Sequence, residues 1–239
     1  MPVTIPARGA TGVDWPPMPR TAPAAPLRAV ARRLRGPSFR RRVPQYLLGL
    51  VTMAVGLAVM LEAGVGVGPW AVFHEGIAVR TALTFGQALI LVGVVVQAFA
   101  WWAGESPGPG TALNMLLVGP FVDLFLASGW VPVPDTLGLG LLQVTAGVVL
   151  IGAGSGLYIT ARFGAGPRDG FVLAASRLSG ATVRRVRTLL EIVVLAVGWL
   201  LGGTVGIGTV LFALAIGPAM QAAIRLFSLP AARPVPAGD

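Results

Sequence analysis

Residues 44–127 of this chain recur, without a gap, as residues 142–225. A shift of 98 residues aligns the two segments, and 23 of the 84 aligned pairs are identical. Shared apolar composition does not explain why Gly-Pro turns coincide in register. The coinciding turns are Gly66-Val67-Gly68-Pro69 with Gly164-Ala165-Gly166-Pro167, and Gly119-Pro120 with Gly217-Pro218. The chain is therefore a duplicated unit, and its fold must be one that two copies of this unit build together.

The composition places both copies in a membrane. The chain is 55% hydrophobic and 11% charged, with a mean hydropathy of +0.79. A soluble domain carries about 25% charged residues, so this chain cannot cover a surface that faces water. We expect the lipid bilayer to surround it. Cysteine is absent, which excludes disulfides and thiolate chemistry, and we expect no metal site and no cofactor.

The apolar segments predict an all-α integral membrane protein with six transmembrane helices, because a helix needs about 20 mostly apolar residues to cross the bilayer. Each repeat then holds three spans, and this odd number makes the second copy enter the membrane from the opposite side. Inverted repeats of this kind are typical of secondary transporters, although channels and some membrane enzymes share them. The expected spans are 44–62, 84–104, 110–127, 138–161, 187–203 and 207–226.

The basic residues predict how the chain is oriented. All 18 are arginines, and with the N-terminus inside only Arg80 falls on the outer side. The positive-inside rule then makes both termini cytoplasmic, and we do not expect nucleic acid as a partner. A contact of Arg28–Arg42 with anionic lipid is a secondary expectation. The expected division is a disordered basic tail (1–43), repeat 1 (44–127), an external connector (128–137), repeat 2 (138–227) and a C-terminal tail (228–239).

The Gly-x-Gly-Pro elements predict a short helix in each repeat. Proline suits the first position of a helix, so we expect helices to begin at Pro69, after Gly68, and at Pro167, after Gly166. Each is too short to span, and suits a re-entrant or interfacial half-helix. Two half-helix N-termini facing the protein centre would favour an anion. The alternative is a surface turn followed by an amphipathic connector.

Polar residues near these elements and within the spans are candidates for a substrate path. The copies differ just after the proline, where Trp70-Ala71 in the first copy faces Arg168-Asp169 in the second. An acidic residue in a span has a purpose or a partner. We expect Arg187 and Glu191 to form a structural ion pair, because their i, i+4 spacing puts them on one helix face. The path candidates are Gly68, Pro69, Trp70, His74, Glu75, Asn114, Asp123, Gly166, Pro167, Arg168 and Asp169.

Several of these motifs resemble the YczE/YyaS/YitT family of bacterial membrane proteins, in its YczE-like branch. They are Gly68-Pro69-Trp70, His74-Glu75-Gly76, Gly110-Thr111-Ala112-Leu113-Asn114, Asp123, Gly164 to Gly170 and Gly206-Ile207-Gly208-Thr209. The resemblance covers about residues 44–227. It implies a multi-pass protein of the bacterial cytoplasmic membrane, and it offers no catalytic residues. The family often has Asp after Gly-Pro-Trp, where this chain has Ala71.

We interpret the chain as a small secondary transporter or permease of unknown substrate, with a site between the two inverted repeats. The alternative is a membrane scaffold or assembly factor that transports nothing. A membrane-embedded enzyme is a remote alternative, because we find no nucleophile–base pair, metal cluster or phosphate loop, and we expect no enzymatic activity. A small bundle of six helices also makes a homodimer an expectation.

Overall fold

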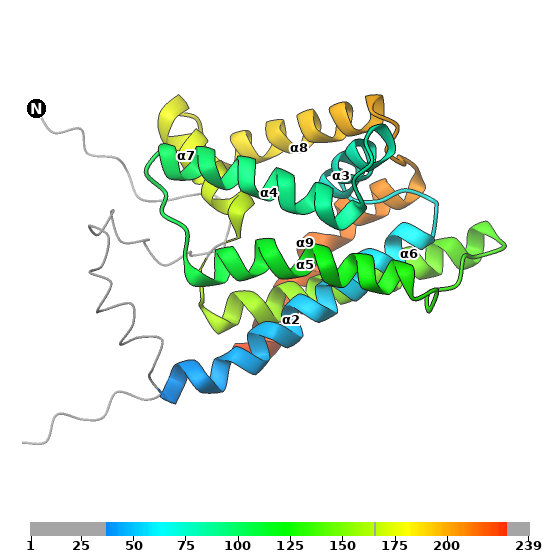
Figure 1. The fold of residues 1–239 in the computed structure, drawn as a ribbon, viewed down its shortest axis with the longest axis horizontal. Helices are drawn as coiled ribbons and strands as arrows, with labels where there is room; N and C mark the ends of the chain where they lie inside the picture. Colours follow the sequence, from blue (N-terminus) through cyan, green and yellow to red (C-terminus); the bar gives the residue numbers. More distant parts are fainter. Residues whose placement is uncertain (1–36, 165, 229–239) are drawn as a thin grey trace, which may run out of the picture.

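The computed structural model describes residues 37–164 and 166–228, and this part of the chain is all-helical (Figure 1). Residues 1–36 and 229–239 lie outside the described residues. The predictions for most of the two tails, and for most of the Arg28–Arg42 lipid contact, fall on them. The helices are α2 (Pro37–Glu62), α3 (Pro69–Arg80), α4 (Phe85–Trp102), α5 (Pro109–Ala127), α6 (Leu137–Ala161), α7 (Pro167–Ser179), α8 (Val183–Leu200) and α9 (Ile207–Phe227).

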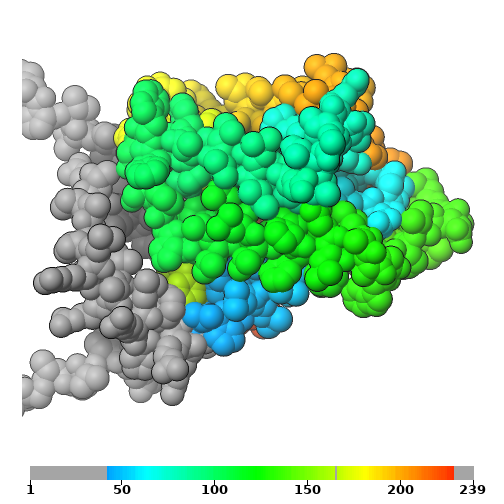
Figure 2. All heavy atoms as spheres, viewed as in Figure 1, coloured from blue at the N-terminus to red at the C-terminus, as the bar shows by residue number. Residues whose placement is uncertain are grey.

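Five of these helices are long and apolar enough to cross a membrane: α2 from Arg42, α4, α5, α6 and α9. They coincide with five of the six expected spans. α8 covers most of the sixth but does not meet the same criterion, because Arg184, Arg185, Arg187 and Glu191 lie in its first half. Figure 2 shows α4 and α5 over much of one face of the molecule. The two helices expose several large apolar side chains, among them Leu91, Val95, Leu116 and Leu124.

The helix that contains the first span begins before the span itself. α2 begins at Pro37 and runs through Pro44, so residues 37–43 are helical and do not belong to a disordered tail. Arginine is a good helix former, so the helix can extend from the span toward the chain start. Pro44 lies inside this helix and lacks the amide hydrogen that would bond the carbonyl of Arg40.

The centre of the fold is the crossing of α2 with α6, which packs through glycines. A Cβ added to Gly49 would lie 2.8 Å from the carbonyl oxygen of Gly154, and one added to Gly56 would lie 2.9 Å from that of Gly147. Helix backbones approach this closely only where side chains are absent. Residue numbers rise along α2 as they fall along α6, so the two helices run antiparallel. The 98-residue shift relates Gly49 to Gly147 and Gly56 to Gly154, so the two glycine pairs are equivalent.

Two glutamines fasten the same crossing in matching ways. Gln45 Nε2 donates to the carbonyl oxygen of Leu157 at 3.2 Å, and Gln143 Nε2 donates to that of Val59 at 3.0 Å. Gln45 and Gln143 are repeat mates, and so are Val59 and Leu157. An amide that hydrogen-bonds a helix carbonyl satisfies both groups away from water. The glutamines therefore join the two repeats, and the sequence match at these positions reflects contact between the copies.

Each short helix packs against the longer helices of both repeats. α3 contacts α8 and α4, and α7 contacts α4 and α8, so the pair lies between α4 and α8 (Figure 1). α5 packs on α2, and α9 packs on α6. The two halves differ in one respect: α4 packs along α5, whereas α8 does not pack along α9. This arrangement brings the starts of α3 and α7 inside the molecule.

The far ends of the short helices are also held in matching ways. Arg80 Nε donates to the carbonyl oxygen of Leu201 at 2.9 Å, and Arg177 donates to the carbonyl oxygen of Ala103. Ala103 and Leu201 are repeat mates at the ends of α4 and α8. An arginine near a helix C-terminus satisfies carbonyls that lack a helical partner. Each short helix is thus fixed to the end of a long helix from the other repeat.

Candidate functional site

The loops before α3 and α7 adopt the turns that their glycines predict. Gly66 has φ of 110° and Gly164 has φ of 135°, a region that favours glycine. Helices then begin at Pro69 and Pro167, as predicted. The carbonyl oxygen of Val65 accepts a hydrogen bond from Gly208 N–H at 2.8 Å, and that of Phe163 accepts one from Gly110 N–H at 3.0 Å. Each loop is therefore docked on the helix start of the opposite repeat.

The Gly-x-Gly-Thr sequences build those helix starts. Thr111 Oγ1 accepts from Gly108 N–H at 3.1 Å, and Thr209 Oγ1 accepts from Gly206 N–H at 3.2 Å. Both threonines are buried, and in each case the hydroxyl satisfies an amide that has no helical partner. The repeated motif was found in the sequence, but its threonines were given no role. A threonine three residues after a glycine, in both copies, could have indicated this capping hydrogen bond.

The starts of α3 and α7 meet at Arg168 and Trp70. The guanidinium carbon of Arg168 lies 4.6 Å from the centroid of the Trp70 ring, which is a cation–π contact. Within the described residues Arg168 forms no ion pair with Asp169. Arg168 is exposed, yet burial among surrounding protein lowers its pKa to about 10, which leaves it charged at neutral pH.

His74 lies one helical turn beyond Trp70 and is only 2% exposed. Its Nδ1 atom is buried without a hydrogen-bond partner in the described part of the chain, and its ring packs against those of Trp70, Phe73 and Phe85. Burial lowers the pKa of His74 well below its usual value, and the charge of Arg168 lowers it further. His74 is therefore neutral. Helical side chains lean toward the helix N-terminus, so the ring lies over the start of α3.

Asp169 lies in the first turn of α7. Burial raises its pKa, while Arg187, Arg168 and the amide of Gly166 act in the opposite direction. A Cβ added to Gly166 would lie 3.6 Å from both Asp169 Oδ2 and the hydroxyl oxygen of Tyr158, which comes from α6. The carboxylate thus lies beside the start of its own helix, close to the hydroxyl of Tyr158 and to the charges of Arg168 and Arg187.

The expected ion pair of α8 is confirmed next to this carboxylate. Arg187 Nε lies 3.1 Å from Glu191 Oε1. Both residues interact electrostatically with Arg168. The two charges of this pair neutralise each other. Among the residues that the structure describes, Arg168 is a cation near the helix starts that forms no ion pair with a carboxylate.

Two acidic candidates are instead used to hold helices together. Glu75 accepts hydrogen bonds from Thr204, at 2.7 Å from the amide and 2.8 Å from the hydroxyl. Asp123 accepts one at 2.5 Å from the hydroxyl of Thr84 and one at 2.8 Å from the amide of Gly86. Glu75 thus fixes α3 to the segment before α9, and Asp123 fixes α5 to the start of α4.

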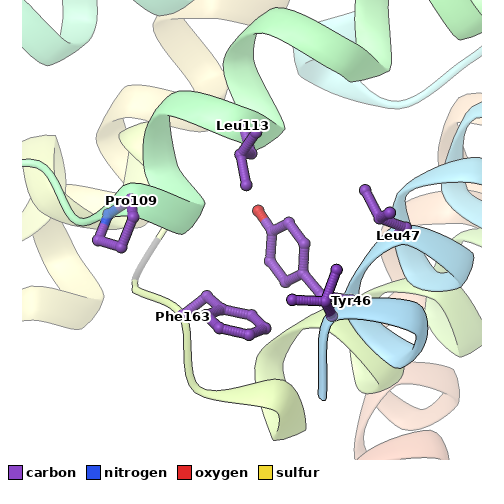
Figure 3. A pocket seen from close by; sticks show the side chains of 6 residues that line it. Tyr46, Leu47, Pro109, Leu113 and Phe163 are labelled. Atoms are coloured by element: carbon purple, nitrogen blue, oxygen red, sulfur yellow. The ribbon is translucent and has the colours of Figure 1, made fainter. Parts of the chain in front are cut away.

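A small apolar pocket lies at the end of the bundle near the loop after α6 (Figure 3). Its volume is about 30 Å³, which is close to the volume that one water occupies in the liquid. Tyr46 points across it and donates its hydroxyl to the carbonyl oxygen of Gly110 at 2.5 Å, and the backbone of Asn114 lies next to the same hydroxyl. The pocket is too small and too apolar for a charged solute. It is lined by Val43, Tyr46, Leu47, Pro109, Leu113 and Phe163.

No group of three or more His, Asp or Glu side chains that could hold a metal ion lies within residues 37–164 and 166–228. The site is thus built from two helix starts, one arginine, one neutral histidine and one half-buried carboxyl group. Such groups bind and orient a charged solute and exchange protons with it. The structure brings together Trp70, His74, Arg168 and Asp169 of the candidate residues, and leaves Glu75, Asn114 and Asp123 outside this cluster.

Comparisons with known proteins give relatives without a known activity. The model of a family of unknown function, DUF6198, matches residues 40–225. The chain is 35% identical to "Uncharacterized membrane protein YczE" of Bacillus subtilis strain 168 over 187 residues, which are 77% of this chain and 84% of the relative. It is 34% identical to an uncharacterized protein of Haemophilus influenzae over 175 residues (73% and 79%) and 27% identical to "Uncharacterized protein YyaS" of B. subtilis over 172 residues (70% and 84%). No solved structure matches.

Proposed function

This chain belongs to the DUF6198 family as a YczE-like bacterial membrane protein, and from that premise we propose that it is a small secondary transporter or permease for an anionic solute. The family resemblance drawn from the motifs is confirmed. The observation that carries the proposal is the meeting of the two half-helix starts at Arg168 and Trp70. Broken or short helices whose N-termini converge near the midplane form the substrate sites of many transporters.

The proposed membrane topology is an inverted repeat of six spans, with α8 as the sixth. Its support is that the same contacts recur with the repeats exchanged: the glycine pairs and the glutamine bonds between α2 and α6, and the docking of each loop on the opposite helix start. A two-fold axis in the membrane plane produces such an exchange. The arginines of α8 then lie at its cytoplasmic end, and both termini are cytoplasmic.

An anion suits the electrostatics of this site. Unpaired first-turn amides and the helix dipole make a helix N-terminus attractive to negative charge. α7 supplies its own acid, Asp169, in the first turn, whereas α3 has none there. The start of α3 therefore keeps its affinity for an anion, and Arg168 lies next to it. A guanidinium binds a carboxylate through two parallel hydrogen bonds, so we expect a small carboxylate.

The proposed route to the site runs past α8. α4 closes one side by packing along α5, but α8 leaves α9 uncovered. Arg168 is exposed while His74 is buried. This difference supports access from the side on which α7 lies, which the proposed topology makes the cytoplasmic side.

A binding assay on the purified full-length protein tests this function. Thermal unfolding is measured in detergent with added formate, benzoate, phosphate or sulfate, against chloride at equal ionic strength. We expect a carboxylate to raise Tm in a saturable way, and Arg168→Gln to abolish the shift. Arg185→Gln removes an exposed arginine of α8 and should retain it. Uptake of the same anion into proteoliposomes then follows. If no anion raises Tm and none enters the vesicles, the transport function is wrong.

The same assay separates transport from the scaffold alternative. A scaffold has dry, inert helix starts, so Arg168→Gln would change only the amount of protein in the membrane. An enzyme would convert the bound anion, which chromatography of the incubated solution detects, and we propose that no conversion occurs. A variant that is produced at the normal level but has lost anion binding supports the transporter.

A further inference from the structure

We propose that the site takes up its anion together with a proton and that Asp169 is the group that receives this proton. The inference rests on the transport function proposed above and adds the coupling ion to it. It is drawn from the difference between the two half-helices. α7 places a carboxyl group in its first turn, beside Arg168, while α3 has no acid at its start and presents Trp70 there instead.

The charges around the two helix starts balance before a solute arrives. Arg168 and Asp169 carry one charge of each sign, and Arg187 with Glu191 carries another such pair. A bound anion leaves one negative charge in excess among protein atoms that exclude water, and such a charge is costly. Protonation of Asp169 restores balance. Protonation also removes a negative charge that repels the solute beside Arg168.

Among the titratable groups around the two helix starts, Asp169 is the one suited to accept this proton. α8 contributes Arg187 and Glu191, α6 contributes Tyr158, and α4 contributes no titratable side chain between Phe85 and Trp102. From α3, His74 faces Arg168 and is already neutral because burial lowers its pKa. Burial raises the pKa of Asp169, which brings its titration closer to neutral pH than that of an exposed aspartate.

His74 gives an independent indication that a ligand belongs at the start of α3. Its Nδ1 atom is buried without a partner in the described part of the chain, and the side chain is 98% covered, given its 2% exposure. A buried polar atom without a hydrogen bond destabilises the site. A solute lying between the first turn of α3 and Arg168 would reach this atom, which satisfies it. A neutral imidazole adds no charge, so the balance that assigns the proton to Asp169 is unchanged.

The sign of the pH dependence follows from this assignment. Below its pKa Asp169 is protonated, the site carries the charge of Arg168, and the anion binds well. As pH rises through that pKa, binding must be accompanied by proton uptake, so affinity falls toward tenfold for each pH unit by linkage. Asp169→Asn mimics the protonated form. It should keep high affinity at every pH.

The experiment measures the affinity of the full-length protein for formate and for benzoate between about pH 6 and about pH 8, where both probes are ionised because carboxyl groups titrate lower. We expect wild-type affinity to fall several-fold to tenfold per unit, and dye-detected proton uptake to accompany binding in weak buffer. Asp169→Asn should remove both effects, and Asp135→Asn, at an exposed aspartate between α5 and α6, should keep both.

Three results separate this inference from the function on which it rests. If the wild type binds the anion with the same affinity across this pH range and takes up no proton, the coupling is wrong while anion binding stands. If Asp169→Asn retains the wild-type slope, the proton goes elsewhere and Asp169 is not its carrier. If neither probe binds to the wild type or to Asp169→Asn at any pH, the anion-binding function itself fails.

Discussion

The helix pairs α4–α5 and α8–α9 occupy equivalent places in the two repeats, yet only the first is closely packed. Gly86 of α4 lies against Gly119 of α5, and Met115 packs beside Gly93. The counterparts of Gly86 and Gly93 are Arg184 and Glu191, and α8 does not pack along α9. The contacts that hold the two repeats together were therefore kept after the duplication. The packing of α4 along α5 has no counterpart between α8 and α9, on the side from which we propose that the solute enters.

The largest expected effect compares the matching glycines Gly119 and Gly217. A methyl group at Gly119 meets the backbone of Gly86, whereas one at Gly217 meets nothing within 4 Å. Gly119→Ala should lower the free energy of unfolding by about 1–3 kcal/mol through overpacking. Gly217→Ala should raise it by up to about 1 kcal/mol, because alanine is the better helix former. Unfolding in mixed detergent–SDS micelles measures both.

Equal shifts in Gly119→Ala and Gly217→Ala would contradict the difference between the two interfaces. Gly138→Ala is a further control, because Gly138 also lies in a helix with open space around it. It should resemble Gly217→Ala. A large loss there would show that helix glycines matter for a reason other than close packing.

The next effect concerns Asp123 and its repeat mate Gln221. Asp123 accepts two hydrogen bonds at the start of α4, whereas Gln221 is exposed. Asp123→Ala should cost about 1–2 kcal/mol of unfolding free energy because an amide and a hydroxyl lose their acceptor, and Gln221→Ala should cost less than about 0.5 kcal/mol. A double-mutant cycle with Thr84→Val isolates the bond. Additive effects would mean that Thr84 and Asp123 do not interact.

The helix starts of α5 and α9 should respond alike when their threonines are substituted. Thr111 and Thr209 each accept from the amide of a glycine three residues earlier. Thr111→Val and Thr209→Val keep the shape of the side chain and remove the acceptor, at a cost of about 1 kcal/mol each. If the two losses of unfolding free energy differ by more than about 1 kcal/mol, the two helix starts are not equivalent.

The sequence predicted the features that repeat better than those that differ. Matching Gly-x-Gly-Pro turns gave the starts of both short helices, because positive φ and proline restrict the backbone locally. The partner of Asp123 was not predictable, because Thr84 is 39 residues away and only packing brings α4 onto α5. The contact of Arg168 with Trp70 likewise joins two repeats, so no local pattern contains it. Arg187 and Glu191 were predictable, because helical spacing alone makes them neighbours.

The smallest expected effect concerns the arginines that end the two short helices. Arg80 and Arg177 donate to the matching carbonyls of Leu201 and Ala103, but Arg177 also pairs with Glu105 at 2.9 Å. A cation near a helix C-terminus contributes about 0.3–1 kcal/mol, and an exposed ion pair adds little. Arg80→Gln and Arg177→Gln should therefore each cost less than about 1 kcal/mol. The loss at Arg177 should shrink more with added salt than the loss at Arg80, since screening also weakens the ion pair with Glu105. An equal or larger salt dependence at Arg80 would mean that the ion pair of Arg177 adds nothing to the hold on α7.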